Sequence, residues 1–237
     1  MKKATKHDIE FIRDYFLENY SGVVTELQYS NDYELLVDII LSAQCTDKRV
    51  NIITPALFAK YPDTKSLSKA DIEDVKELLK SCSFFNNKAE NIIKMAINVE
   101  EFHDGVIPHN QKELMKLAGV GNKTANVFLI EADGANLMAV DTHVFRVSHR
   151  LGLSSGKTVE QTEAELVKKL KADLHIFHQA MVLFGRYKCK AVNPMCEDCG
   201  LKSVCKSDGR FGVDGKKTTK NISIKSKKII KTKASEK

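Results

Sequence analysis

A lysine stands where the sequence predicts a tight turn followed by a helix. The turn is the segment Leu-Ala-Gly-Val-Gly-Asn-Lys-Thr at residues 117–124, between two runs with helical spacing. Gly119 and Gly121 allow a turn too tight for side chains and let the main chain come close to a ligand. The amides of the following helix, which Asn122 is expected to cap, would form an anion site beside Lys123. An ordinary turn with a solvated lysine is the alternative, so neighbouring residues must decide.

A carboxylate follows that lysine by eighteen residues. The segment Val-Asp-Thr-His at residues 140–143 precedes another predicted helix, with Asp141 or Thr142 as its cap. A lysine amine can act as a nucleophile, and a carboxylate can accept its proton or stabilise positive charge on a substrate. A helix-capping aspartate without any catalytic part is the ordinary alternative.

Four of the six cysteines form one compact cluster with the spacing Cys-x6-Cys-x2-Cys-x5-Cys: Cys189, Cys196, Cys199 and Cys205. In a reducing compartment such clustering favours metal binding over disulfides. Four thiolates suit a tetrahedral zinc ion or a [4Fe–4S] cluster. Zinc ribbons usually carry two Cys-x2-Cys pairs, so the single pair here favours iron–sulfur and leaves zinc open. Cys45 and Cys82 stand apart from this cluster.

The net charge of +6 is distributed unevenly. Residues 212–237 contain nine lysines against two acidic side chains, so residues 1–211 are nearly neutral. We expect this tail to be mostly disordered and to act as a nucleic-acid-binding arm or as a solubility segment. Four further lysines surround the cysteines and could contact phosphates or balance the charge of a cluster: Lys188, Lys190, Lys202 and Lys206.

The apolar runs are short for a membrane protein. None approaches the roughly 18 residues needed to span a bilayer. The basic start of the chain is followed by charged residues rather than by an export signal. We therefore expect an intracellular protein, cytoplasmic or nucleoid-associated, that does not contact membranes.

Helical periodicity dominates the chain up to residue 211, so the predicted fold is all-α. Two helices flank the turn, and a capping box at residues 110–113 opens the first of them. The other predicted helices are at 7–20, 31–43, 47–60, 68–80, 88–102, 142–152, 158–170 and 174–187. Pro55 is expected to mark a kink or a new start, and Ser68 with Asp71 is expected to open the helix at 68–80.

Four segments together resemble the endonuclease III family of the helix-hairpin-helix DNA glycosylase superfamily. They are Leu-Ser-Ala-Gln at 41–44, the turn and helix start at 117–125, Val-Asp-Thr-His at 140–143, and the cysteine loop at 189–205. The resemblance implies a base-excision repair enzyme, both a DNA N-glycosylase and an abasic-site lyase, that removes damaged bases, with oxidised pyrimidines expected. It also implies a [4Fe–4S] cluster on the four cysteines. The expected partner is duplex DNA with damaged bases or abasic sites, and the protein is expected to be a monomer.

The resemblance also implies a site between two helical lobes. A six-helix barrel would span residues 22–135. The lobe that carries the cluster would combine residues 1–21 with 136–211, and DNA would lie in the cleft between the lobes.

The resemblance assigns the chemistry to two residues. Lys123 would attack the sugar, form a Schiff base and cleave the abasic strand by β-elimination, while Asp141 would accept a proton and stabilise positive charge. Burial and the helix N-terminus would lower the pKa of Lys123, and Asp141 would raise it. The damaged nucleotide must first be flipped out. Gln44 would fill the gap with help from Phe84, and the other expected DNA contacts are Gly119, Val120, Gly121, Thr124, His143 and Lys190.

One segment departs from the family pattern. Residues 83–86 read Ser-Phe-Phe-Asn, where the family is closer to Gly-Leu-Tyr-Asn. The preferred lesion and opposite base therefore stay open. A non-catalytic helix-hairpin-helix DNA-binding protein with a redox-sensing cluster is the alternative, and in it Lys123 would be dispensable. Adenine-mismatch glycosylases share the hairpin, aspartate and cluster but typically lack this lysine.

Overall fold

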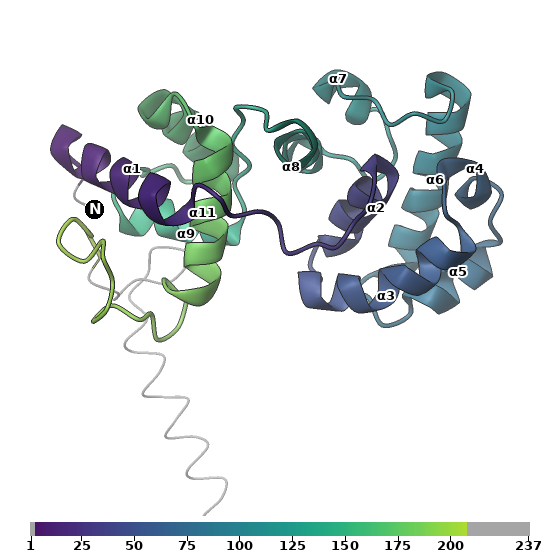
Figure 1. Ribbon diagram of the computed structural model, residues 1–237, viewed down its shortest axis with the longest axis horizontal. Coiled ribbons are helices and arrows are strands. Elements are labelled where there is room, and N and C mark those ends of the chain that lie inside the picture. The colour runs from purple at the N-terminus through teal and green to yellow at the C-terminus, as the bar shows by residue number, and fades with distance from the viewer. Residues whose placement is uncertain (1–2, 208–237) are drawn as a thin grey trace, which may run out of the picture. The chain divides into compact units, whose positions relative to one another are not determined.

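The computed structural model describes residues 3–207, which form helices and loops without any strand (Figure 1). The all-α prediction is confirmed for this part of the chain. The helices are α1 (Lys6–Tyr20), α2 (Asp32–Ser42), α3 (Asp47–Lys60), α4 (Thr64–Leu67), α5 (Ile72–Leu79), α6 (Phe85–His103), α7 (Gln111–Leu114), α8 (Asn122–Asp133), α9 (Thr142–Arg150), α10 (Val159–Leu170) and α11 (Leu174–Tyr187). None of them is long and apolar enough to cross a membrane.

The described residues divide into two compact units. One unit is residues 24–137, with helices α2 to α8. The other combines residues 3–23 with 138–207, with helices α1, α9, α10 and α11. Each unit has its own hydrophobic core.

Helix α2 is the centre of the first unit. It is apolar around most of its circumference, and such a helix must be buried on all sides. It packs against α3, α6 and α8. Asn31 starts it by accepting a hydrogen bond from the backbone amide of Glu34 at 2.9 Å. The chain leaves α2 directly into the Gln44 loop, so the core of this unit fixes where that loop begins.

The predicted helix at 47–60 is confirmed, whereas the helix start predicted at Ser68 was wrong. Helix α3 runs through Pro55 without a new start, and its buried face, with Val50, Ile53 and Leu57, holds both halves to the core. Helix α5 begins after Asp71, whose carboxylate accepts from two first-turn amides, whereas Ser68 ends the short helix α4.

The second unit is held together by aromatic side chains. Helix α11 packs along α1 and α9 (Figure 1). The ring of Phe16 from α1 meets Phe177 and Phe184 from α11 edge to face, with centroids 6.4 and 5.5 Å apart. Such pairs add specific geometry to apolar burial. These ring contacts hold α11 against α1. The cysteine loop follows directly from the end of α11, so they also determine where that loop begins.

A carboxylic acid lies inside the first core. Asp38 on α2 is fully buried, and neither carboxylate oxygen has a hydrogen-bond partner of good geometry within residues 3–207. Burial raises its pKa to about 7, against a weaker opposing effect of the Thr54 hydroxyl. The folded protein therefore holds Asp38 protonated at pH values where the unfolded chain has released the proton.

This burial predicts a pH-dependent stability. A raised folded-state pKa contributes stability that is complete below about pH 4 and lost as the pH rises to about 7. Asp38→Asn cannot ionise, so its free energy of unfolding relative to the natural protein should rise by up to about 4 kcal/mol between pH 4 and pH 8. Urea unfolding at both pH values measures this, and a pH-independent difference would contradict the buried acid.

Candidate nucleic-acid interface and metal centre

The predicted turn lies between α7 and α8. Asn110 caps α7 by accepting from the amides of Lys112 and Glu113 at 2.9 and 3.3 Å. The Glu113 carboxylate accepts hydrogen bonds from Lys116 Nζ at 2.8 Å. It therefore stabilises the end of α7 and does not form the predicted capping box at the start of the helix. The turn closes with a bond from the Val120 amide to the Leu117 carbonyl at 3.1 Å. These bonds set the direction in which α8 starts.

The two glycines of this turn serve different purposes. Gly119 has a φ of +78°, and a Cβ there would lie 3.0 Å from the Cβ of Asn91, so the fold itself requires glycine. Gly121 has an ordinary extended backbone, and a Cβ there would meet no atom within 4 Å. Nothing inside the protein demands glycine at position 121. The open space in front of it allows a ligand to approach the main chain closely.

The prediction that Asn122 caps α8 was wrong. Gly121 occupies the cap position, and no side chain caps the helix. The Asn122 side chain lies within the first turn, where its Oδ1 accepts from Gln111 Nε2 at 3.1 Å. The first-turn amides of α8 are therefore left for an external acceptor, and an uncapped helix N-terminus favours anions.

Lys123 lies in this first turn with an exposed side chain. Thr124 is half-buried, and Val120 is buried, so only the backbone of Val120 can face a ligand.

Two more predicted DNA contacts lie on exposed loops of the same unit. Gln44 follows the end of α2, and Phe84 precedes α6 with 63% of its surface exposed. Both residues have left-handed backbone conformations, with φ of 55° and 58°. Such conformations are uncommon for residues other than glycine and cluster at ligand-binding positions.

Asp141 and His143 lie at the start of α9 in the other unit. Asp141 is the cap, and its Oδ1 accepts from the amides of His143 and Val144 at 2.8 and 2.7 Å. Within residues 3–207 no hydrogen bond reaches Oδ2, so one oxygen holds the helix and the second is available for chemistry. Burial lowers the pKa of the His143 imidazole, which contacts Arg146 Nη2 through Nδ1 at 3.1 Å.

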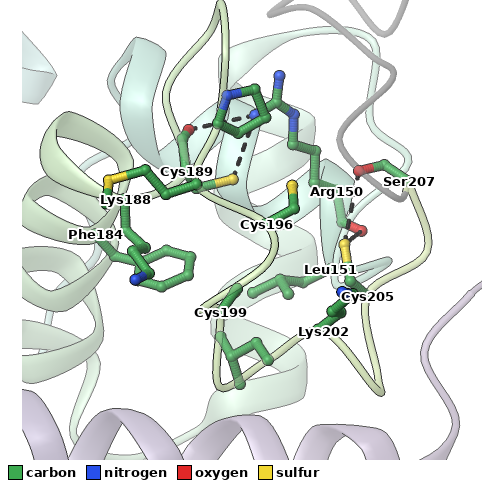
Figure 2. Close-up of a pocket in the computed structure, with 13 residues that line it drawn as sticks. Arg150, Leu151, Phe184, Lys188, Cys189, Cys196, Cys199, Lys202, Cys205 and Ser207 are labelled. Carbon is green, nitrogen blue, oxygen red and sulfur yellow. Dashed lines mark hydrogen bonds between the residues drawn. The ribbon is translucent and has the colours of Figure 1, made fainter.

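The four clustered cysteines line one cavity of about 110 Å³ (Figure 2). Burial raises the pKa of the Cys196 and Cys199 thiols, and the charges of the neighbouring cysteines raise both further. Arg150 and Lys202, which also line the cavity, oppose this effect at Cys196. Four thiolates in this space therefore need additional positive charge inside the cavity.

The thiols surround this space rather than meet at a point. Within the described residues, no three His, Cys, Asp or Glu side chains converge closely enough to hold a metal ion. Four thiols that line one cavity supply the donor set of a four-iron cluster, which cysteine thiolates ligate.

Two buried arginines that the sequence analysis missed hold the start of the cysteine loop. Arg146 Nε donates to the Cys189 carbonyl at 2.9 Å. Arg150 Nη1 donates to the Lys190 carbonyl at 2.7 Å. It also donates to Cys189 Sγ at 3.3 Å (Figure 2). Their spacing of four residues on an otherwise apolar face of α9 was the available signal.

The end of the cysteine loop is tied to α1. Lys206 Nζ lies 2.7 Å from Asp8 Oδ2, and this bond is the main reason why the pKa of Asp8 is lowered to about 2. Lys206 is thus engaged within the protein, whereas Lys190 and Lys202 are exposed. The predicted lysine-rich arm at 212–237 lies outside the described residues.

The predicted site residues thus fall into two groups. Residues 24–137 hold Gln44, Phe84, Gly119, Val120, Gly121, Lys123 and Thr124. The other unit holds Asp141, His143, Lys190, Cys189, Cys196, Cys199 and Cys205.

Comparison with known proteins gives this arrangement a family. The family described as HhH-GPD superfamily base excision DNA repair protein matches residues 37–172. Endonuclease III of Bacillus subtilis is 42% identical over 200 residues, which cover 84% of this chain and 91% of that protein. Endonuclease III of Escherichia coli K12 is 41% identical over 189 residues, covering 79% and 90%.

Solved structures agree. A trapped endonuclease III–DNA covalent intermediate matches with a TM-score of 0.80 and 38% identity, covering 86% of this chain and 97% of that chain. A non-covalent endonuclease III–DNA complex matches with the same TM-score and identity. A thermostable thymine-DNA glycosylase, 24% identical with a TM-score of 0.72, shares the fold. This chain belongs to the endonuclease III family of the HhH-GPD superfamily of base-excision DNA repair proteins.

Proposed function

We propose that this protein excises oxidised pyrimidines from duplex DNA as a monomer and cleaves the abasic strand through a Schiff base on Lys123. Family membership makes it a base-excision repair enzyme, a DNA glycosylase with abasic-site lyase activity, rather than a non-catalytic DNA-binding protein. The observation that carries the residue assignment is the start of α8, where uncapped amides and an exposed lysine share one helical turn.

The first step is to hold the DNA backbone. The first-turn amides of α8 offer hydrogen bonds to a phosphate, and the positive end of the helix dipole favours its charge. The open space at Gly121 lets the phosphate reach these amides. Such contacts carry no sequence information, which suits an enzyme that must bind lesions in any sequence.

The second step is to take the damaged nucleotide out of the stack. A base within a duplex shields its sugar carbon, so flipping must precede attack and costs a few kcal/mol. Gln44 and Phe84 lie on two loops, and both have exposed side chains and left-handed backbones. We assign Gln44 to the space that the flipped nucleotide leaves and Phe84 to stacking beside it.

The third step is covalent. The neutral amine of Lys123 attacks C1′, and the bond from C1′ to the base breaks. The base leaves with a proton, the nitrogen gives up one proton, and the C1′–O4′ bond breaks as O4′ is protonated, so that the sugar ring opens and a protonated imine forms. Loss of a proton from C2′ then expels the 3′ phosphate from C3′. Asp141 accepts the lysine proton and stabilises positive charge on the sugar, and Oδ2 is the oxygen that serves this purpose because Oδ1 caps α9.

The cysteine loop is proposed to hold a [4Fe–4S] cluster on Cys189, Cys196, Cys199 and Cys205. The four-thiol lining of one cavity and the cations around it support this assignment. The cluster would supply the positive charge that the thiolates require. With Arg150 it would fix the loop that presents Lys190, an exposed side chain suited to a phosphate contact.

The catalytic assignment predicts different effects for two variants. Lys123→Gln should abolish the covalent adduct that borohydride traps on an oxidised-pyrimidine duplex, while DNA binding persists because backbone amides hold the phosphate. Asp141→Asn should retain the fold, since asparagine also caps helices well. It should slow base excision by at least about 100-fold, because the proton acceptor and its charge are lost.

A ready-made abasic duplex provides the control. No base departs there, so strand cleavage by Asp141→Asn should fall less than excision does. Adduct formation by Lys123→Gln at the natural rate would show that another residue is the nucleophile.

The two turn glycines provide a matched pair. Gly119→Ala should lower the free energy of unfolding by about 1–3 kcal/mol, because alanine disfavours a positive φ and meets Asn91. Gly121→Ala should lower it by no more than about 1 kcal/mol, because alanine suits the cap position less well than glycine but meets no atom there. It should nevertheless weaken binding to undamaged duplex DNA several-fold, because the added methyl group stands where the phosphate approaches. Unchanged affinity in Gly121→Ala would refute the proposed contact.

The metal assignment predicts about four iron and four acid-labile sulfide per chain after anaerobic purification. Cys199→Ala should lower both contents together, whereas Cys45→Ala, which removes a thiol far from the cluster in sequence, should lower neither. Stoichiometric zinc without iron in the natural protein would overturn the assignment.

A further inference from the structure

Cys45 and Cys82, separated by 37 residues in the sequence, lie together in the first unit. Cys82 Sγ lies 3.6 Å from the carbonyl oxygen of Leu41, four residues before Cys45, and Cys45 packs against the same core cluster, so the two thiols are near enough to interact. Cys82 is almost fully buried, while Cys45 is partly exposed at the edge of the same core. In the sequence they only stand apart from the four clustered cysteines, and nothing there brings them together.

A buried lysine completes the group. Lys88 is 5% exposed, and its Nζ donates to Cys82 Sγ at 3.2 Å and to the Leu41 carbonyl at 2.8 Å. Within residues 3–207 no carboxylate pairs with Lys88. A buried cation without a carboxylate favours an anion on its other partner, and here that partner is a thiol.

Two opposing effects act on the pKa of the Cys82 thiol. Burial raises the pKa of Cys82, and the Lys88 hydrogen bond and charge oppose that effect. Cys82 is thus shielded from solvent but has a cation that stabilises its thiolate once a reaction partner is in place. The partly exposed Cys45 is that partner.

We propose that Cys45 and Cys82 are a thiol pair that hydroperoxides oxidise to a disulfide, which ties the Gln44 loop to the Phe84 loop. Cys45 follows Gln44 directly, and Cys82 precedes Phe84 by two residues. The hydrogen bond from Lys88 to Leu41 also fixes the end of α2, from which the Gln44 loop departs.

The reaction is a two-electron oxidation in two steps. The Cys45 thiolate attacks a peroxide oxygen, so that an S–O bond forms, the O–O bond breaks and water or an alcohol leaves. The Cys82 thiolate then attacks the Cys45 sulfur, the S–O bond breaks, and hydroxide leaves as water with the proton from the Cys82 thiol. Two thiols and one hydrogen peroxide thus give one disulfide and two waters.

The consequence for DNA rests on the function proposed above. Gln44 and Phe84 must enter the duplex from two loops around one flipped nucleotide. A covalent link between residues 45 and 82 fixes the separation of these loops, so the oxidised enzyme should excise bases several-fold more slowly.

Peptide mass spectrometry tests the bond itself. The full-length protein with its metal centre is treated with one equivalent of hydrogen peroxide, alkylated and digested. A peptide that crosslinks residues 45 and 82 should appear and should vanish after dithiothreitol.

Two variants test the proposed steps. In Cys82→Ser, the oxidation of Cys45 should stop at the sulfenic acid, which dimedone captures. Lys88→Met should slow disulfide formation about tenfold. Full alkylation of both cysteines after peroxide, in the natural protein, would overturn the proposal whatever the DNA activity.

Excision kinetics test the consequence. Peroxide should slow the natural protein, and dithiothreitol should restore it. Cys45→Ser retains the four clustered cysteines, so it should stay active after the same treatment. Equal loss in Cys45→Ser would show that damage at the metal centre is responsible and would refute the loop effect. Absence of excision in the reduced natural protein would instead contradict the function proposed above, while the mass measurement still decides the disulfide.

Discussion

The way in which α8 begins is the constraint on which the DNA-binding surface depends. Gly119 adopts a positive φ against Asn91, and the chain then passes through an extended glycine directly into helical residues. Neither glycine carries a side chain that could satisfy the first-turn amides. Because the amides and Lys123 share this turn, one backbone geometry both offers an anion site and positions a candidate nucleophile.

In the other unit, helix α9 positions both the Asp141 carboxylate and the cysteine loop. Its first turn is capped by one oxygen of Asp141, and its buried face carries Arg146 and Arg150, which hold the carbonyls at the start of the cysteine loop. The carboxylate and the four cysteines proposed as metal ligands are thus supported by one helix. Loss of the proposed cluster would remove a second restraint on this loop, an effect that needs no redox step.

The sequence predicted the helices and most of their starts because Thr158, Asn110 and Asp141 cap as their types favour. It failed where two capping residues compete, since Ser68 and Asp71 both suit a helix start and only packing decides. It also failed where long-range contacts determine a role. Basic side chains on helices are usually solvated, so the place of Arg150 on the apolar face of α9 was the only sign of its burial in the sequence. Cys82 meets Lys88 and Cys45 only after α2 and α6 pack together.

The central claim is that the lysine in the first turn of α8 bonds covalently to the sugar. Mapping the borohydride-trapped adduct by proteolysis and tandem mass spectrometry tests it on the natural protein, without any substitution. We predict that the sugar remnant is attached to Lys123 Nζ. A remnant on Lys112, Lys116 or the terminal amine would contradict the assignment and would leave the uncapped turn as a phosphate-binding element alone.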